Sequence, residues 1–214
     1  MTATRTATTP LSPTHRVAAA ISELCAPAVL VTLFLVATAI GAAGWPGGAL
    51  QAVVAATFTT VLPLAVVLVL VRAGRLTDHH ISERRQRAPV LAGTLLSIGV
   101  GLCLLALLDA PWALVAAVWC TVAGVALVLV VNLWWKLSAH SAVAVFVTCG
   151  AVAVFVTCGA VTIAGPAALL LLPMPVAVGW SRVRLGAHTA GQVAAGFLVG
   201  GVIGLAFAAV VGNR

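Results

Sequence analysis

Apolar stretches of about twenty residues, joined by short polar connections, constrain this chain more than any other feature of its sequence. A helix of about that length crosses the hydrocarbon core of a bilayer. The stretches are continuous, whereas the strands of a transmembrane barrel alternate in hydrophobicity over about ten residues. Only 7% of the residues are charged, against about a quarter in soluble domains. The sequence therefore predicts an all-α, polytopic transmembrane helical bundle.

The predicted bundle has six to seven spans in a single membrane-embedded domain over residues 24–211, after a polar N-terminal tail over residues 1–23. The spans are expected at residues 24–44, 50–71, 90–108, 112–135, 141–164, 166–180 and 190–211. The sixth span is short and contains Pro173 and Pro175, so we expect it to be tilted, broken or partly re-entrant.

A tandem copy lies in the fifth predicted span, where AVAVFVTCG at residues 142–150 recurs at residues 151–159. Nine residues advance a helix by about 2.5 turns, so equivalent residues fall on opposite faces and the helix gains about 13 Å. The copy either reshapes a cavity or is a replication slip that lipid tolerates. We favour the slip, because every added residue suits lipid.

Polar residues gather in three connections, which the predicted spans place at one membrane face. Their sequences are RAGRLTDHHISERRQRAP at 72–89, WWKLSAHSA at 134–142 and GWSRVRLGAHTAGQ at 179–192. A helical hairpin separates each from the next, so they share a face in either orientation. They supply Arg84, Arg85, Arg87, Lys136, Arg182 and Arg184, together with His79, His80, His140 and His188.

Arginines and histidines together point to a phosphate ester. Guanidinium groups bind phosphate oxygens bidentately, and histidine can attack phosphorus or protonate a leaving oxygen near neutral pH. Ser138 lies where the fifth span should begin and is a good N-cap residue. The free N–H groups of that helix start would favour an anion. These residues predict chemistry on a phosphate at the membrane surface.

The three connections resemble the type 2 phosphatidic acid phosphatase superfamily. Its signature is Lys, six residues and Arg-Pro; then Pro-Ser-Gly-His; then Ser-Arg, five residues, His, three residues and Asp. The third motif matches as Ser181-Arg182, His188 and Gln192, and the second as Leu137-Ser138-Ala139-His140. The first is the loosest, with His80 at the Lys position and Arg87-Ala88 in place of Arg-Pro. The resemblance covers residues 75–195.

The resemblance implies that His188 attacks phosphorus to give a phosphohistidine and that His140 protonates the leaving alcohol. Further residues would bind the phosphate oxygens. These are His80, Arg87, Ser138, Ser181 and Arg182, with Lys136 and Arg184 outside the family pattern but near enough to contribute. No metal or other cofactor is expected in this chemistry, because fixed cations meet the phosphoryl charge.

Gln192 departs from the pattern, because an acid there would orient the imidazole and stabilise its positive charge. A glutamine carbonyl can accept the imidazole N–H but brings no charge. Catalysis can then be slower, can use Asp78 or Glu83, or can be absent, and the sequence leaves these alternatives open.

The expected substrate is a phosphatidate-like lipid or a prenyl phosphate or diphosphate within the membrane. A lipid phosphate phosphatase is the first prediction. A prenyl-diphosphate transferase or cyclase on the same scaffold, and a catalytically degenerate lipid-binding protein, are the alternatives. Nucleic acid is not an expected partner, because the cations flank membrane spans. The glycine-rich segment AAGFLVGGVIG at 194–204 permits close packing within or between chains, which leaves the oligomeric state open.

The charge distribution predicts the orientation in a bacterial-type inner, or plasma, membrane. With seven spans, the face with the N-terminus and the three connections has ten cations, and Arg214 lies alone on the other. The positive-inside rule then places the site mouth in the cytoplasm.

Overall fold

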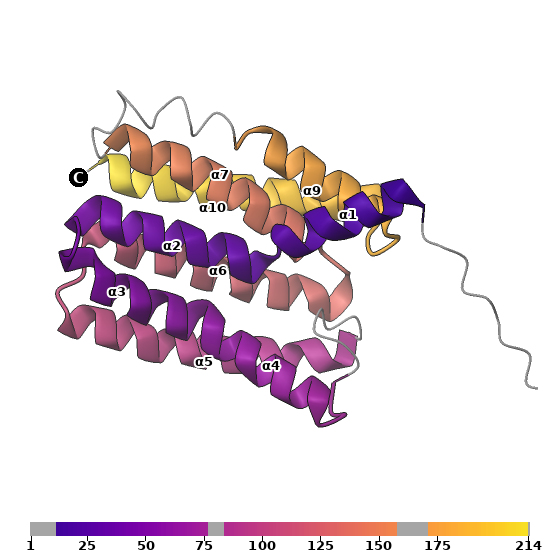
Figure 1. Cartoon of the computed structure of the whole chain (residues 1–214), viewed down its shortest axis with the longest axis horizontal. Coiled ribbons are helices and arrows are strands. Elements are labelled where there is room, and N and C mark those ends of the chain that lie inside the picture. The colour runs from indigo at the N-terminus through magenta and orange to yellow at the C-terminus, as the bar shows by residue number, and fades with distance from the viewer. Residues whose placement is uncertain (1–11, 77–83, 158–170, 214) are drawn as a thin grey trace, which may run out of the picture.

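The computed structural model describes residues 12–76, 84–157 and 171–213, with only the backbone course for 84–87 and 155–157. The described residues form helices and no strands, which confirms the all-α prediction. The helices are α1 (Pro13–Leu24), α2 (Pro27–Ala43), α3 (Gly47–Ala56), the π-helical turn η1 (Thr57–Val61), α4 (Leu62–Arg72), α5 (Arg84–Leu107), α6 (Trp112–Trp134), α7 (Ala139–Thr157), α9 (Pro173–Arg184) and α10 (Ala190–Gly212) (Figure 1).

Four helical segments among the described residues are long and apolar enough to cross a membrane. They are Gly47–Arg72, Ala88–Leu107, Trp112–Trp134 and Ala190–Gly212. Helices α1 and α2, bent by 43° at the break between them, would together form a fifth. Ala139–Val154 is a shorter apolar helix. The described chain thus has four to five candidate spans, while six to seven stays a prediction. Part of the sixth predicted span, residues 166–170, lies outside the described residues.

Helix α1 occupies residues 13–23 of the predicted polar tail, which is about half of it. Ser12 caps it by accepting a hydrogen bond from the His15 N–H, and Pro13 stands at its first position. Its buried residues are Ala18 and Ser22, four positions apart on one face. Helix α1 packs against α9. Residues 13–23 are therefore a docked helix, because α9 covers the face that a solvated tail would leave exposed.

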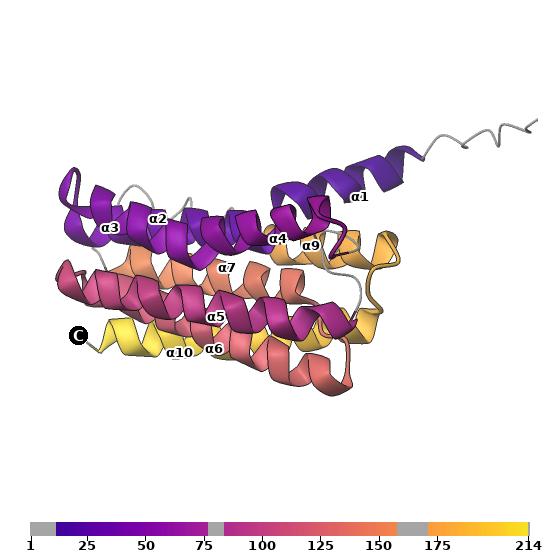
Figure 2. The ribbon, with the colours of Figure 1, turned by 90° about the horizontal axis from the view of Figure 1, so that it is seen from below.

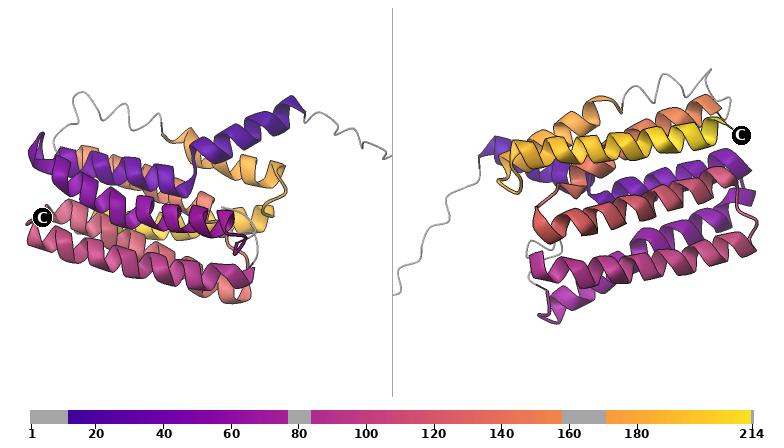
Figure 3. Two further views of the ribbon diagram at one scale, coloured as in Figure 1. Left: turned by 60° about the horizontal axis from the view of Figure 1, so that its bottom comes forward. Right: turned by 180° about the vertical axis from the view of Figure 1, so that it is seen from behind.

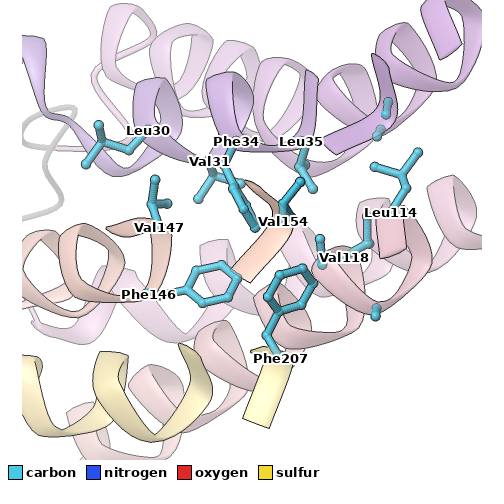
Figure 4. Packing of buried hydrophobic residues seen from close by; sticks show 14 of the residues in the cluster. Leu30, Val31, Phe34, Leu35, Leu114, Val118, Phe146, Val147, Val154 and Phe207 are labelled. Carbon is cyan, nitrogen blue, oxygen red and sulfur yellow. The ribbon is translucent and has the colours of Figure 1, made fainter. Parts of the chain in front are cut away.

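The helices form a layered bundle. Helices α7 and α10 lie along one side, α2 and α6 in the middle, and α3, α4 and α5 on the other side (Figures 1 and 3). The core joins α2, α7 and α10 through Phe34, Phe146 and Phe207, whose rings meet edge to face (Figure 4). Their centroids are 5.3, 5.5 and 6.3 Å apart. The same rings fill the space between the side layer and the middle layer.

Helices α7 and α10 approach to backbone contact along a glycine stripe. A Cβ atom at Gly196 would lie 2.6 Å from the Ser138 carbonyl oxygen, and one at Gly204 would lie 2.6 Å from the Cys149 Cβ. At Gly200 it would overlap the Ala142 carbonyl. The glycine-rich segment predicted to permit close packing therefore packs within the chain.

The described parts of the three polar connections lie at one end of the bundle. Helix α4 ends and α5 begins there, as do the junctions of α6 with α7 and of α9 with α10, while α10 ends at the opposite end (Figures 1 and 2). Helix α1 projects from the polar end (Figure 2). The bundle thus gathers the predicted site residues that the structure describes at one end, although not on one side.

Candidate functional site

Ser138 caps α7, as its position predicted. Its side-chain oxygen accepts a hydrogen bond from the Ser141 N–H at 3.4 Å and lies 2.9 Å from the Ser141 hydroxyl oxygen. Both serines are fully buried, and His140 in the same turn is 6% exposed. The α7 start therefore holds a buried imidazole beside two hydroxyl groups.

The start of α10 is fixed by a capping box. The Thr189 hydroxyl accepts from the Gln192 N–H at 3.3 Å, and Gln192 Oε1 accepts from the Thr189 N–H at 3.2 Å. The same Gln192 oxygen lies 3.2 Å from Nδ1 of the half-buried His188. In the tautomer with the proton on Nδ1, this contact is a hydrogen bond that holds the ring, and the imidazole lone pair is on Nε2.

The two helix starts meet. The Ser138 N–H donates to the Gln192 carbonyl oxygen at 3.4 Å, and Gly196 lets the α7 backbone approach the next turn of α10. His140 follows Ser138 by two residues, and His188 lies one residue before the α10 cap. The structure therefore brings the predicted second and third motifs together.

Arg182 connects this region to α1. Its carbonyl oxygen accepts from the N–H groups of Ala187 and His188, at 3.1 and 3.2 Å, so the end of α9 shapes the turn that holds His188. Its side chain is 7% exposed, and Nη1 donates to the Ser22 hydroxyl at 2.5 Å. Burial lowers the pKa of the Arg182 guanidinium, and the nearby Glu23 carboxylate opposes that shift.

Ser22 and Glu23 are neighbours of the site that the sequence analysis missed. Both fell in the predicted tail, where nothing marked them as contacts of α9. The only available signal was the spacing of Thr14, Ala18 and Ser22, which puts small residues on one helical face. The hydrogen bond joins residues 160 positions apart, and no local pattern predicts such a partner.

Other predicted site residues lie elsewhere or are committed to other contacts. The buried Ser181 hydroxyl donates to the Val178 carbonyl oxygen of its own helix at 2.7 Å. Arg184 is exposed and donates to Thr14 of α1 at 3.1 Å. Lys136 is half-buried in the extended segment before α7. His80 lies outside the described residues.

The first predicted motif lies across the bundle from the other two. Arg87 is in the first turn of α5, and only its backbone is described. Helix α5 packs on α3, η1, α4 and α6, and α6 lies between α5 and α10 (Figures 1 and 3). The expectation of one cluster from all three connections is therefore met by two of them. Although α5 begins at the same end of the bundle as α7 and α10, it lies on a different side.

Two mainly apolar grooves open between helices. A groove of about 370 Å³ between α9 and α10 lies beside the site. It is lined by Val176, Gly179, Trp180, Val183, Ala190, Val193, Ala194 and Phe197. A groove of about 650 Å³ between η1–α4 and α5 has Arg75 in its lining. Of these two grooves, only the first is lined by residues that are close in sequence to Arg182, His188 and Gln192.

No cluster of three or more histidine, cysteine or acidic side chains suited to a metal ion occurs among residues 12–76, 84–157 and 171–213. Comparison of the chain with known protein families, with curated proteins and with solved structures finds no match.

Proposed function

We propose that this protein is a metal-independent lipid phosphate phosphatase of the membrane, with His188 as nucleophile on a bundle of six to seven spans. The observation that carries the proposal is the contact between His188 Nδ1 and Gln192 Oε1 next to the junction of α7 and α10. It supports an imidazole with a fixed orientation, and His140 lies in the first turn of the neighbouring helix.

The proposed reaction has two steps. The Nε2 lone pair of His188 forms a bond to phosphorus while the bond from phosphorus to the ester oxygen breaks, and His140 gives a proton to the departing alcohol. Water then attacks phosphorus and gives a proton back to His140, the bond to Nε2 breaks, and inorganic phosphate leaves. Arg182 would meet the negative charge on the phosphoryl oxygens.

The groove between α9 and α10 supports a lipid substrate. Its walls are almost wholly apolar and include Trp180 and Phe197. Two other lining residues are close to the site in sequence. Ala190 lies two residues after His188, and Val183 lies one residue after Arg182. A tail in this groove would place its phosphate at the polar end of the bundle. Phosphatidate-like and prenyl phosphates share this chemistry.

The direct test is phosphate release by protein purified in detergent, with EDTA present, over a panel of lipid phosphates. We expect His188→Ala to abolish release and His140→Ala to lower kcat by about 10²- to 10⁴-fold, the range for a lost general acid. His15→Ala on α1 is the matched control and should keep parental activity. Release that persists in His188→Ala would refute the proposed nucleophile.

A second function, lipid binding without turnover, is favoured by the neutrality of Gln192. Its carbonyl carries the capping box and the His188 contact but supplies no charge to a developing imidazolium. In that case the protein would bind a lipid phosphate in both parent and His188→Ala forms and release no phosphate from either.

A further inference from the structure

One face of α1 is turned toward the arginines of α9. Thr14, Ala18 and Ser22 are spaced by four residues, and Ala18 and Ser22 are buried. Thr14 accepts from Arg184 at 3.1 Å, and Ser22 accepts from Arg182 at 2.5 Å. The two hydrogen bonds differ in setting, because the Arg184 contact is exposed and the Arg182 contact is buried.

The hydrogen-bonding capacity of Arg182 is only partly used. Nη1 is held by Ser22, whereas Nε is buried and has no hydrogen-bond partner among the described residues. A buried donor left unsatisfied costs free energy, and the cost is larger on a charged group. Nε and Nη2 form the edge of a guanidinium that binds two oxygens of a phosphate side by side. An anion at that edge would satisfy the buried Nε.

We propose that Ser22 is a positioning residue for phosphate binding: it anchors Nη1 of Arg182 so that the Nε edge stays presented to the phosphoryl group. The inference rests on the proposed function in one respect, that Arg182 binds the phosphate. It extends the site to α1. A rotamer-rich arginine that is already held loses less entropy when the anion arrives, so the hydroxyl raises affinity without touching the ligand.

The test compares three variants of α1 in the full-length protein. Ser22→Ala removes the acceptor, Ser22→Thr keeps it, and Thr14→Ala removes the matched acceptor from the exposed Arg184. The probes are orthovanadate, which mimics the phosphoryl group, and the dephosphorylated lipid alcohol, which lacks it. Affinity for each probe is measured by calorimetry, and KM and kcat by phosphate release.

We expect Ser22→Ala to weaken orthovanadate about tenfold and to raise KM similarly, which is the scale of a hydrogen bond to a charged group. Affinity for the alcohol should not change. Ser22→Thr should retain orthovanadate binding, and Thr14→Ala should match the parent for both probes. Should Ser22→Ala fail to fold, Ser22→Cys gives the same comparison, because sulfur is a weak acceptor of similar size.

Two results would overturn the inference. One is equal orthovanadate affinity in Ser22→Ala and Thr14→Ala. The other is a parallel loss of orthovanadate and alcohol affinity, which would make Ser22 a purely structural contact. The parent protein could also release no phosphate and still bind orthovanadate in a way that depends on Ser22. That result would refute the proposed phosphatase activity and retain the positioning role of Ser22.

Discussion

His188 and Gln192 show how one side chain serves two purposes. The Gln192 oxygen closes the capping box with Thr189 and also contacts His188 Nδ1. Since the capping box fixes Gln192, it also fixes the imidazole that Gln192 contacts. A carboxylate in the same place would keep both hydrogen bonds and add a negative charge at a helix N-terminus, where such a charge is favourable.

Gln192→Glu is therefore expected to raise kcat for phosphate release by about tenfold, which corresponds to about 1.4 kcal/mol of transition-state stabilisation. The carboxylate stabilises the positive charge that develops on His188. Gln192→Met, similar in size but without the acceptor, should lower kcat. Steady-state phosphate release at saturating substrate measures both variants. A Gln192→Glu protein that folds like the parent and is no faster would contradict this role.

Residue contacts were predictable from the sequence where the partners are close in the chain. His188 and Gln192 are four residues apart, and Ser138 stands directly before its helix, so spacing and capping rules were sufficient. Arg182 and Ser22 were not predictable as a pair, because only tertiary packing brings them together. The Ser181 contact was not predictable for a related reason: its hydroxyl bonds to its own helix, and sequence does not show which acceptor a serine selects.

At the scale of elements, the glycine stripe of α10 decides how closely the two site helices approach. Gly196, Gly200 and Gly204 each face α7 backbone or side-chain atoms that a methyl group would meet. Gly201, one residue along the helix, faces only the end of Val145, at 3.9 Å from a built Cβ. Gly201 is therefore a matched control position, because a methyl group added there has space.

Gly200→Ala is expected to destabilise the protein by about 1–3 kcal/mol, since the added methyl overlaps the Ala142 carbonyl and forces the helices apart. Gly201→Ala should be neutral or stabilising by up to about 1 kcal/mol, because alanine favours a helix more than glycine does. Unfolding in detergent, followed by circular dichroism, measures both. Equal stability of the two variants would show that the α7–α10 contact tolerates separation.

The sequence predicted where most helices lie better than it predicted how they pack. The long apolar stretches predicted most helices to within a few residues of their observed bounds. Helix α1 was missed because its polar composition is that of a tail and its buried face is narrow, with Ala18 and Ser22 its buried residues. A helix of 12 residues gains most of its stability from packing, and the α9 surface that covers it is built from a distant part of the chain.

At the scale of the whole molecule, the two ends of the bundle differ in charge. Five cationic residues belong to helix ends or connections at the polar end: Arg72, Arg75, Lys136, Arg182 and Arg184. Helix α10 finishes at the other end. Helix α2 starts at the polar end and α10 finishes at the other (Figure 1), so a chain that crosses a membrane along this axis would cross it an odd number of times between these two points. Loops at one end of a bundle can still be far apart across it. Helices α5 and α10, for example, are separated by α6.

The positive-inside rule then predicts the orientation. A reporter fused after Arg214 should be active only on the extracytoplasmic side, and the same reporter inserted after Gly74 should be active only in the cytoplasm. Gly74 has a φ of 68° in an exposed turn after α4, which suits an insertion. Cytoplasmic signals from both fusions would contradict the odd parity, and exchanged signals would invert the orientation.

The backbone contact between α7 and α10 also has a consequence for biogenesis. The ribosome delivers α7 to the translocon before α10 has been synthesised, so the nascent helix enters the bilayer without its later partner, and its polar side chains include the hydroxyls of Ser141 and Thr148. Both hydroxyls already bond within the α7 region, Thr148 to the Ala144 carbonyl and Ser141 to Ser138. Such internal hydrogen bonds lower the free-energy cost of exposing these hydroxyl groups to lipid before α10 is inserted. The proposed pair of His140 and His188 therefore comes together only after α10 has been inserted.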